Sequence, residues 1–300
     1  MEQMDLFAQS YERYKITKPI RLIECFAGIG AQAKALENLG VPYESHRISE
    51  WAIPSIKAYA AIHHGWRGEP LEGYSLEEMV AMTDGISVDY CKPLTEAQRR
   101  KKGAKELAII LGAMKACKDD CPDISKVTGE SLGIESESNR GHCYIMTYSF
   151  PCQDLSQAGT TQGMTKGSGT RSGLLWEIER ILLELQDRHE RPDILIMENV
   201  PQVHGAKNLK DFQAWVKALD DMGYSSYYKD LNAKDFGIPQ NRDRCFMVSI
   251  LGQWGYNFPK KSELKYPLKN YLDKKVDEWY YLPDKYAEKF QRYDEDGNPI

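Results

Sequence analysis

The sequence predicts an α/β protein built around a mostly parallel, doubly wound sheet. Ile20–Phe26 is an apolar strand candidate, and it is followed by glycines and a helix pattern. Tyr43–Ser49 and Trp51–Ile62 repeat this order of strand and helix, and the alternation resumes at Tyr144. Alternation of this kind is typical of a parallel sheet, because a connection between parallel strands has to cross back over the sheet.

The first half of the chain holds two strand–helix pairs and then a long, less regular stretch. The helix pattern AQAKALENLG follows the first strand, and Gly40 is its expected end. The side chains expected to face the core are Ala31, Ala35, Leu36 and Leu39. Residues 65–120 are interpreted as an insertion with one charged helix, whose inward face holds Leu107, Ile110, Leu111 and Met114. The basic run Arg99–Lys102 is typical of a solvated face, with nucleic-acid contact as the alternative.

The second half returns to strands and helices. Strands are expected at Tyr144–Ser149, Asp193–Met197 and Cys245–Leu251. Two amphipathic helices are expected, with apolar positions at Leu174, Ile178, Ile181, Leu182 and Leu185, and at Leu209, Phe212, Val216 and Leu219. From residue 252 onward aromatic residues, lysines and prolines dominate, and no further strand–helix unit is predicted.

Composition and charge exclude several classes of protein. The chain has 300 residues, 42% hydrophobic and 28% charged, which is typical of globular proteins. It has no run of eighteen apolar residues and no apolar signal-peptide core, so a cytoplasmic protein without a membrane span is expected. The net charge of −5 argues against a simple basic DNA-binding module, but it is compatible with an enzyme that has a local basic groove.

The cysteines do not indicate a fold held together by disulfide bonds. Seven cysteines in a chain of this length argue against a disulfide framework. Cys117 and Cys121 have the spacing of a metal-binding pair, and His142 and Cys143 follow. No second close pair exists, and Pro122 follows Cys121 directly. Zinc is therefore the minor alternative, and no metal site is expected.

Polar residues follow the first two predicted strands. The turn FAGIG, Phe26–Gly30, lacks the third glycine of a dinucleotide fingerprint and the lysine of a phosphate loop. Its glycines allow a ligand to approach the backbone closely. Glu50 can accept hydrogen bonds from both hydroxyls of a ribose, and Trp51 can stack on an adenine. The alternatives are a capping glutamate and a core tryptophan. Together these residues favour a cofactor that contains adenosine.

Cys152 and Glu198 follow two later strands. Cys152 comes after a Phe-Pro pair in SFPCQDLSQAG, and the residues after it can begin a helix whose positive end would lower the thiol pKa. The alternative is a buried, unreactive cysteine. Glu198, in MENV, is costly to bury without a partner or a chemical role. The alternative is a paired structural carboxylate.

Two arginines enter the last predicted strand. PQNRDR places Gln240, Arg242 and Arg244 at alternate positions, so that in a strand all three would share one face. Two guanidinium groups on one face favour an anion, a carbonyl or a carboxylate as their partner.

FAGIG, SFPCQDLSQAG, MENV and PQNRDR, in this order and with Glu50-Trp51, resemble the DNA cytosine-5 methyltransferase family over roughly residues 20–250. The resemblance implies the fold of an S-adenosylmethionine-dependent methyltransferase, with double-stranded DNA as substrate. It implies that Cys152 adds to carbon 6 of a flipped-out cytosine and that Glu198 acts at N3. Arg244 would hold the cytosine O2, and Arg242 would support the site.

The resemblance also implies further binding residues. Those for S-adenosylmethionine are Phe26, Gly28, Gly30, Glu50, Trp51, Asp123, Ile124 and Leu174. Those for DNA are Gln153, Ser156 and Gln240. The loop from Ser156 to Arg171 resembles the family's loop that closes over DNA.

The resemblance also predicts how the chain is divided into domains. The C-terminal part of the chain does not follow the family's pattern. Residues 1–19 are expected to be an extension, 20–251 the catalytic domain with its insertion at 65–120, and 252–300 the start of an incomplete C-terminal region. The family continues with a recognition region and a Gly-Asn-Ser motif, which DEDGNPI does not match. A truncated chain, a second polypeptide and a small recognition region are the alternatives.

Three functions remain open. The first is a DNA cytosine-5 methyltransferase of a bacterial restriction–modification system or a phage. The others are a non-catalytic subunit that binds DNA or a partner, and an RNA cytosine methyltransferase. The intact set of Cys152, Glu198 and Arg244 favours catalysis.

Overall fold

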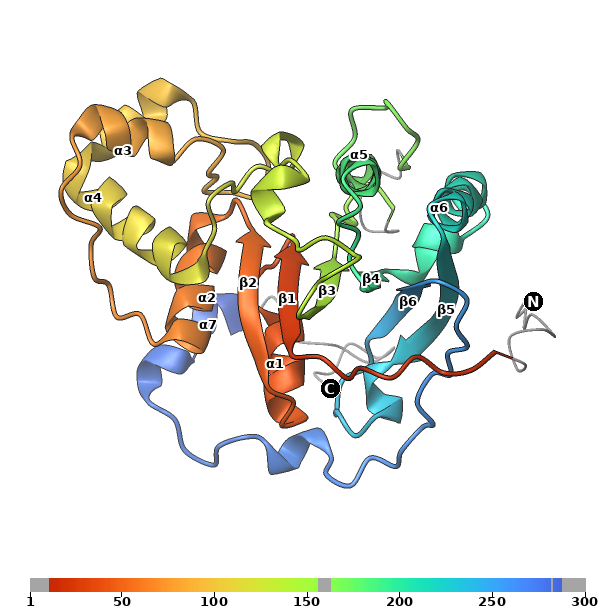
Figure 1. Ribbon diagram of the computed structural model, residues 1–300. Coiled ribbons are helices and arrows are strands. Elements are labelled where there is room, and N and C mark those ends of the chain that lie inside the picture. Colours follow the sequence, from red (N-terminus) through yellow and green to blue (C-terminus); the bar gives the residue numbers. More distant parts are fainter. Residues whose placement is uncertain (1–10, 156–162, 282, 288–300) are drawn as a thin grey trace. The chain divides into compact units, whose positions relative to one another are not determined.

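The computed structural model describes residues 11–155, 163–281 and 283–287, and the chain divides into two compact units. The first unit comprises residues 1–231 and 243–260. The second comprises residues 232–242 and 261–300. The sheet and the helices that cover it belong to the first unit (Figure 1).

The elements follow one another along the chain as the predicted alternation requires. The strands are β1 (Ile20–Cys25), β2 (Tyr43–Ser49), β3 (Cys143–Tyr148), β4 (Ile194–Asn199), β5 (Tyr224–Asn232) and β6 (Asp243–Leu251). The α-helices are α1 (Ala31–Asn38), α2 (Ile53–His64), α3 (Leu76–Met82), α4 (Glu96–Cys117), α5 (Leu175–Asp187), α6 (Leu209–Asp221) and α7 (Asp284–Ala287). Short 3-10 helices are η1 (Ile124–Lys126), η2 (Glu130–Leu132), η3 (Ser172–Leu174), η4 (Pro201–His204), η5 (Ala233–Asp235), η6 (Leu268–Asn270) and η7 (Glu278–Tyr280).

The six strands form one mostly parallel sheet in the order β2-β1-β3-β4-β6-β5, which confirms the predicted fold class. β1 pairs in parallel with β2 and β3, and β3 pairs in parallel with β4. β6 is antiparallel to β4, with Asn199 opposite Cys245. The start of β6 therefore lies at the edge of the sheet where β4 ends.

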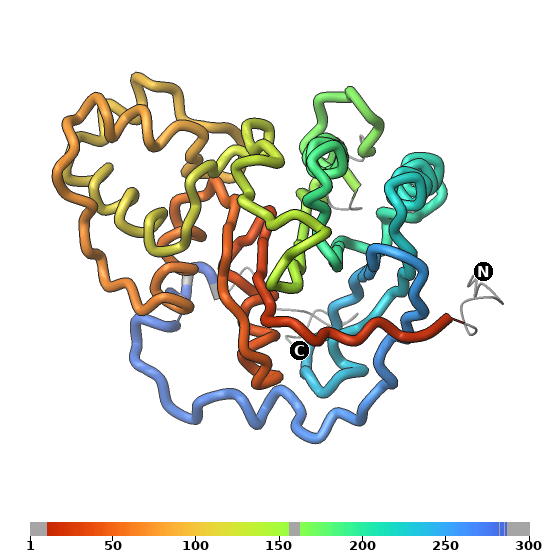
Figure 2. The backbone as a smooth tube through the Cα atoms, viewed as in Figure 1, coloured from red at the N-terminus to blue at the C-terminus, as the bar shows by residue number. Residues whose placement is uncertain are grey.

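Helices cover both faces of this sheet, as expected of a doubly wound fold. One core cluster joins α5 and α6 to the strands and includes the buried Leu182, Trp215 and Tyr148. The other joins α1, α2, α3 and α4 to the strands and includes Tyr59 and Ile110. Figure 2 shows the connection from α2 to β3, which carries α3 and α4, on the β2 side of the sheet. Within the described ranges, no helix has the length and apolar character needed to cross a membrane.

The helix patterns predict burial well in most helices but not in α1. Leu107, Ile110, Leu111 and Met114 of α4 and Ile178, Ile181, Leu182 and Leu185 of α5 are all buried, as predicted. In α1 the predicted inward face is wrong. Ala33 is buried and Leu36 half-buried, whereas Ala31, Ala35 and Leu39 are exposed. Ala33 and Leu36 lie one turn apart, so the short helix contacts the core through a narrow stripe. Leu209, expected to be inward in α6, is also exposed.

The basic run at the start of α4 is not simply a solvated face. Arg99 is buried and donates to the carbonyls of Val80 and Leu94, at 3.1 and 2.6 Å. Arg99 Nη2 also lies 3.0 Å from Asp84 Oδ1. These bonds tie α4 to α3 and to the loop between them. The guanidinium of Arg99 therefore has its hydrogen-bond and ion-pair partners inside the protein.

Candidate active site

The carboxyl ends of β1 to β4 and the amino end of β6 share one edge of the sheet. In open sheets of this kind, ligands bind beyond the carboxyl ends of the strands. β1 leads into Phe26, β2 into Glu50 and β3 into the loop of Cys152, while Glu198 lies at the end of β4. The topology therefore brings the polar residues singled out in the sequence to a common edge.

Glu50 links the first two strand ends. Its Oε2 accepts a hydrogen bond from the Gly28 N–H at 2.7 Å, and its Oε1 accepts one from the Ala52 N–H at 2.8 Å. Glu50 is buried, and this burial raises the pKa of its carboxyl, while the backbone N–H groups partly offset the shift. Each oxygen of a carboxylate has a second acceptor site. Glu50 can thus hold the glycine turn and still accept from a ligand.

The two glycines of this turn occupy their positions for different structural reasons. Gly30 has φ +82, and a Cβ there would lie 2.3 Å from His63 Nε2, so packing against α2 requires a glycine. Gly28 has φ +57, but a Cβ there would meet no atom of the described residues within 4 Å. Of these two glycines, Gly28 is the one beside which the described residues leave open space. Phe26 also has a positive φ, 57°, and its N–H donates to the Ser49 carbonyl at 2.8 Å.

Trp51 and Asp123 flank the end of β2. Trp51 is half-buried, and its carbonyl accepts from the Ser87 N–H at 2.6 Å. Ser49 Oγ donates to the Cys121 carbonyl at 2.9 Å, which ties the segment before η1 to β2. Asp123 caps η1, because its Oδ1 accepts from the Ser125 N–H and hydroxyl at 3.1 and 2.7 Å.

Ile124 and Leu174 pack toward the core. Ile124 is buried, and its carbonyl accepts from Arg180 of α5 at 3.2 Å. Leu174 is half-buried at the end of η3 and packs against the same core cluster. An apolar contact with a ligand is therefore available at Leu174, while most of Ile124 serves packing.

The loop that carries Cys152 is fixed by two residues that the sequence reasoning missed. Ser172 Oγ donates to the Pro151 carbonyl at 2.7 Å, and the Ser172 N–H donates to Asp154 Oδ2 at 3.1 Å. Asn199 Nδ2 donates to the Phe150 carbonyl at 3.0 Å. Asn199 directly follows Glu198, so a short polar side chain at a strand end was the available signal. These bonds attach the loop to β4 and to η3.

Cys152 has a free, half-buried thiol in this loop. The expected helix after it is wrong for the described residues, because Gln153–Leu155 form a turn, closed by the Leu155 N–H on the Cys152 carbonyl at 3.0 Å. Gln153 is half-buried, and its Oε1 is buried without a hydrogen-bond partner among the residues that the structure describes. Ser156 and the start of the predicted mobile loop lie outside the described residues.

Glu198 and Arg244 form an ion pair. Arg244 Nε lies 2.8 Å from Glu198 Oε1, and both side chains are about one-fifth exposed, at 22%. Arg244 Nη1 also donates to the Asp243 carbonyl at 2.6 Å. The pair forms because β6 runs antiparallel to β4 and begins where β4 ends. A carboxyl group and a guanidinium are thereby presented together.

Gln240 and Arg242 do not share a strand with Arg244. β6 begins at Asp243, so the predicted alternation on one strand face is wrong for these two residues. Both are exposed and belong to the second unit, where the Arg242 N–H donates to Asn232 Oδ1 at 3.1 Å. In that unit Gln240 N–H donates to the Ile238 carbonyl at 2.7 Å.

The cysteines considered for zinc have separate partners. Cys117 donates to the Ile56 carbonyl at 3.6 Å, and Cys121 donates to the Asp123 carbonyl at 3.5 Å. Cys143 lies 3.9 Å from the Tyr14 hydroxyl. These contacts give each sulfur a different neighbour.

Known proteins resemble this chain in sequence. A family model described as C-5 cytosine-specific DNA methylase matches residues 91–298, more than half of the chain. The orphan methyltransferase M.SssI of Spiroplasma monobiae is 38% identical over 268 residues, which cover 87% of this chain and 67% of that protein. The Type II methyltransferase M2.ScrFI of Lactococcus lactis subsp. cremoris is 35% identical over 266 residues, covering 88% and 70%. The chain thus spans about two thirds of the length of these relatives.

Solved structures agree on the fold. The S. pombe Dnmt2 methyltransferase is 17% identical with a TM-score of 0.55, over 90% of this chain and 64% of that one. The Entamoeba histolytica methyltransferase EhMeth is 16% identical with a TM-score of 0.51, over 93% and 68%. At this identity the likeness shows a shared fold. Taken with the family model and the two sequence relatives, it shows that this chain belongs to the family of C-5 cytosine-specific DNA methyltransferases.

Proposed function

We propose that this chain transfers a methyl group from S-adenosylmethionine to carbon 5 of cytosine in double-stranded DNA, with Cys152 as the nucleophile. The observation that carries the proposal is the Glu198–Arg244 ion pair of 2.8 Å, at the same sheet edge as the loop of Cys152. A base inside a duplex cannot reach a half-buried thiol, so the cytosine has to be flipped out of the stack. The protein acts where DNA is found, in the bacterial cytoplasm.

The residues around the first two strand ends fit an adenosine-containing cofactor. Gly28 leaves free space beside its backbone, and the buried Glu50 carboxylate retains acceptor capacity for two ribose hydroxyls. Trp51 and Leu174 are half-buried and offer apolar contacts. We assign Phe26, Gly30, Asp123 and Ile124 to the same pocket on the strength of the family resemblance.

The chemistry follows from the poor nucleophilicity of carbon 5. Addition of the Cys152 thiolate to carbon 6 breaks the double bond between carbons 5 and 6, and its electrons enrich carbon 5. Glu198, as the carboxylic acid, gives a proton to N3, so that no negative charge accumulates on the ring. S-adenosylmethionine supplies an electrophilic methyl group when it is bound. Glu198 then takes its proton back from N3, and removal of the carbon 5 proton by a base restores the double bond and expels the Cys152 thiolate.

Arg244 has two roles in this scheme. Its Nε holds the Glu198 carboxyl, and its remaining N–H groups can donate to the cytosine O2. Gln153, next to the nucleophile, offers a buried acceptor that no described residue occupies, which suits contact with DNA or with the flipped base. Arg242 and Gln240 are proposed as further substrate contacts because of the family motif.

The test is transfer of a labelled methyl group from S-adenosylmethionine to DNA, followed by bisulfite mapping. The expected result is 5-methylcytosine in DNA, with RNA of the same sequence unmodified. Because the chain spans about two thirds of its relatives, the assay is run alone and with a C-terminal segment supplied in trans. Methylated RNA with unmodified DNA would identify an RNA enzyme. No methylation in any arm, with DNA binding intact, would identify a non-catalytic subunit.

A further inference from the structure

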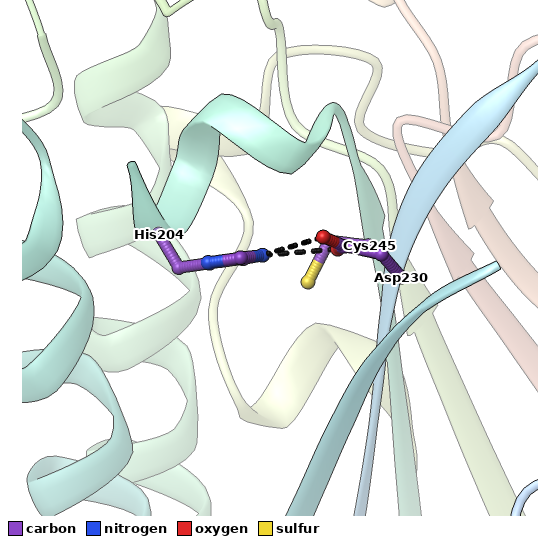
Figure 3. Close-up of side chains that lie close together, drawn as sticks. All are labelled: His204, Asp230 and Cys245. Carbon is purple, nitrogen blue, oxygen red and sulfur yellow. Dashed lines mark hydrogen bonds and ion pairs between the residues drawn. The ribbon is translucent and has the colours of Figure 1, made fainter. Parts of the chain in front are cut away.

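Three potential metal ligands meet on the part of the first unit formed by η4, β5 and β6. His204, Asp230 and Cys245 each offer a ligand atom, and these atoms lie within 4.8 Å of one another. His204 Nε2 is 2.9 Å from Asp230 Oδ1 and 3.1 Å from Oδ2. Figure 3 shows the edge of the His204 imidazole directed at the Asp230 carboxylate, with the Cys245 side chain next to it. The residues are far apart in sequence and match no motif, so sequence reasoning did not find them.

The imidazole is held in place by packing. Its ring contacts the rings of Phe212 and Tyr228, with centroids 5.8 and 5.7 Å away. Cys245 is fully buried in the strand β6, while the Asp230 side chain is 40% exposed. The side chains of His204 and Cys245 are therefore held in place before any ion binds, and Asp230 is the ligand most accessible from solvent.

The donor set selects the kind of ion. One imidazole nitrogen, one carboxylate oxygen and one sulfur suit a borderline-soft divalent ion such as zinc, whereas magnesium and calcium prefer oxygen ligands alone. The distances between ligand atoms in a tetrahedral zinc site are shorter than the 4.8 Å that bounds the distances between these three atoms, so the cluster can close around such an ion. Three protein ligands leave a fourth position for water.

The thiol has to lose its proton for this purpose. Burial raises the pKa of Cys245 above its ordinary value, and the neighbouring Asp230 raises it further. A bound divalent cation reverses this effect, because its charge stabilises the thiolate directly. Binding would thus release one proton from Cys245 to solvent, and the hydrogen bond between His204 and Asp230 would be replaced by two bonds to the ion.

We propose that His204, Asp230 and Cys245 form a binding site for a zinc-like divalent cation. The ion would join η4, β5 and β6 immediately beside the pairing of Asn199 with Cys245. It would take no part in methyl transfer, since the proposed chemistry uses Cys152 and Glu198. Its role would be to fix the start of β6, from which Arg244 reaches Glu198.

The test is titration of the whole chain with Co²⁺ as a spectroscopic substitute for zinc, after treatment with a chelator and a phosphine reductant. The expected result is one equivalent of tightly bound Co²⁺ with a thiolate charge-transfer band and tetrahedral ligand-field bands. Cys245→Ser should lose the charge-transfer band. Cys117→Ser is the matched control, because Cys117 is equally buried but lies outside the cluster, and it should keep the band.

A second pair of variants tests the proposal even if the substitution at the buried Cys245 prevents folding. His204→Gln and Asp230→Asn keep side-chain size, and each should weaken Co²⁺ binding about tenfold or more without lowering the melting temperature of the metal-free protein by a similar extent. Zinc should raise the melting temperature of the wild type but not of these variants. A charge-transfer band that persists in Cys245→Ser, or Co²⁺ affinity unchanged in both other variants, would overturn the proposal and leave a simple ion pair beside a buried cysteine.

Discussion

Arg244 Nε lies 2.8 Å from Glu198 Oε1, so the two groups proposed to bind N3 and O2 of the cytosine are in contact before any substrate is present. The contact joins two antiparallel strands at the edge where the parallel strands end. Groups that are already in position need little rearrangement during the reaction, which is a general source of catalytic power in enzymes.

The first prediction concerns Glu198. In Glu198→Gln the amide can still accept from Arg244 but cannot give up a carboxylic proton to N3. The rate of methyl transfer should fall by about 100- to 10,000-fold, the range usual for loss of a general acid, while S-adenosylmethionine affinity stays unchanged. Glu190→Gln is the control, since Glu190 forms an ion pair of 2.7 Å with Arg188 at the surface. Equal losses in the two variants, measured by single-turnover kinetics, would refute the assigned role.

The second prediction concerns Gly28. Gly28 and Gly40 have similar φ angles, +57 and +66, and a Cβ at either would meet no atom within 4 Å in the part of the chain that the structure describes. Alanine should therefore destabilise the protein by about 1–2 kcal/mol at both positions, because of the left-handed conformation. Only Gly28→Ala should raise the dissociation constant of S-adenosylmethionine, by about tenfold or more, since a ligand approaches that backbone. Calorimetric titration that finds equal affinities would contradict the cofactor assignment.

The third prediction is a pH dependence of cofactor binding. Burial raises the pKa of Glu50, and the buried Asp119 beside it has a pKa raised well above its usual range. The proposed contact needs ionised Glu50, so affinity should be full above the raised pKa and should fall as the pH drops through it. The fall should begin at a higher pH than the ordinary glutamate pKa of about 4.3 would give.

Its control is a second buried carboxyl. Glu24 also has a pKa raised by burial, but it accepts from Tyr59 and Ala33 inside the core. Glu50→Gln should bind weakly with a flat pH profile, and Glu24→Gln should keep the wild-type slope. A wild-type slope in Glu50→Gln would assign the titration to another group.

The fourth prediction tests the core under α5. Leu182 is fully buried, whereas its neighbour Leu183 is 46% exposed. Leu182→Ala should lower the free energy of unfolding by about 2–5 kcal/mol through lost contacts and the cavity left behind. Leu183→Ala should change it by no more than about 0.5 kcal/mol. Urea unfolding of both variants measures this, and equal values would show that the helix is placed incorrectly against the sheet.

How far the sequence predicts the fold depends on how strongly each element is patterned. β1, β3 and β4 are rich in apolar residues, and their predicted bounds lie within two residues of the observed ones. β5 was missed, because YSSYYKDLN is polar and lies at the outer edge of the sheet, where alternation is weak. α3 was missed although Ser75 and Glu78 form a capping box at its start, since the helix has only seven residues.

The site shows the same limits. Cys152, Glu198 and Glu50 could be selected because polar residues directly after apolar strands stand out in the sequence. The family resemblance implied that Glu198 and Arg244 act on the same base, but their direct ion pair could not be derived from spacing, since no pattern tells a parallel from an antiparallel last strand. Ser172 was missed, because a hydroxyl that holds a loop carbonyl has no distinctive sequence context, and Asn199 was missed although its place at a strand end was a usable signal.

The most direct test of the central claim, nucleophilic attack by Cys152, is a covalent trap. On DNA that contains 5-fluorocytosine, carbon 5 carries fluorine, so no base can remove a proton there and the thiolate is not expelled. With S-adenosylmethionine present, the wild type and the control Cys91→Ser, whose cysteine is exposed, should form a protein–DNA adduct that survives denaturation and maps to Cys152. Cys152→Ser should form none. An adduct in Cys152→Ser, or none in a wild type that methylates ordinary DNA, would contradict the account.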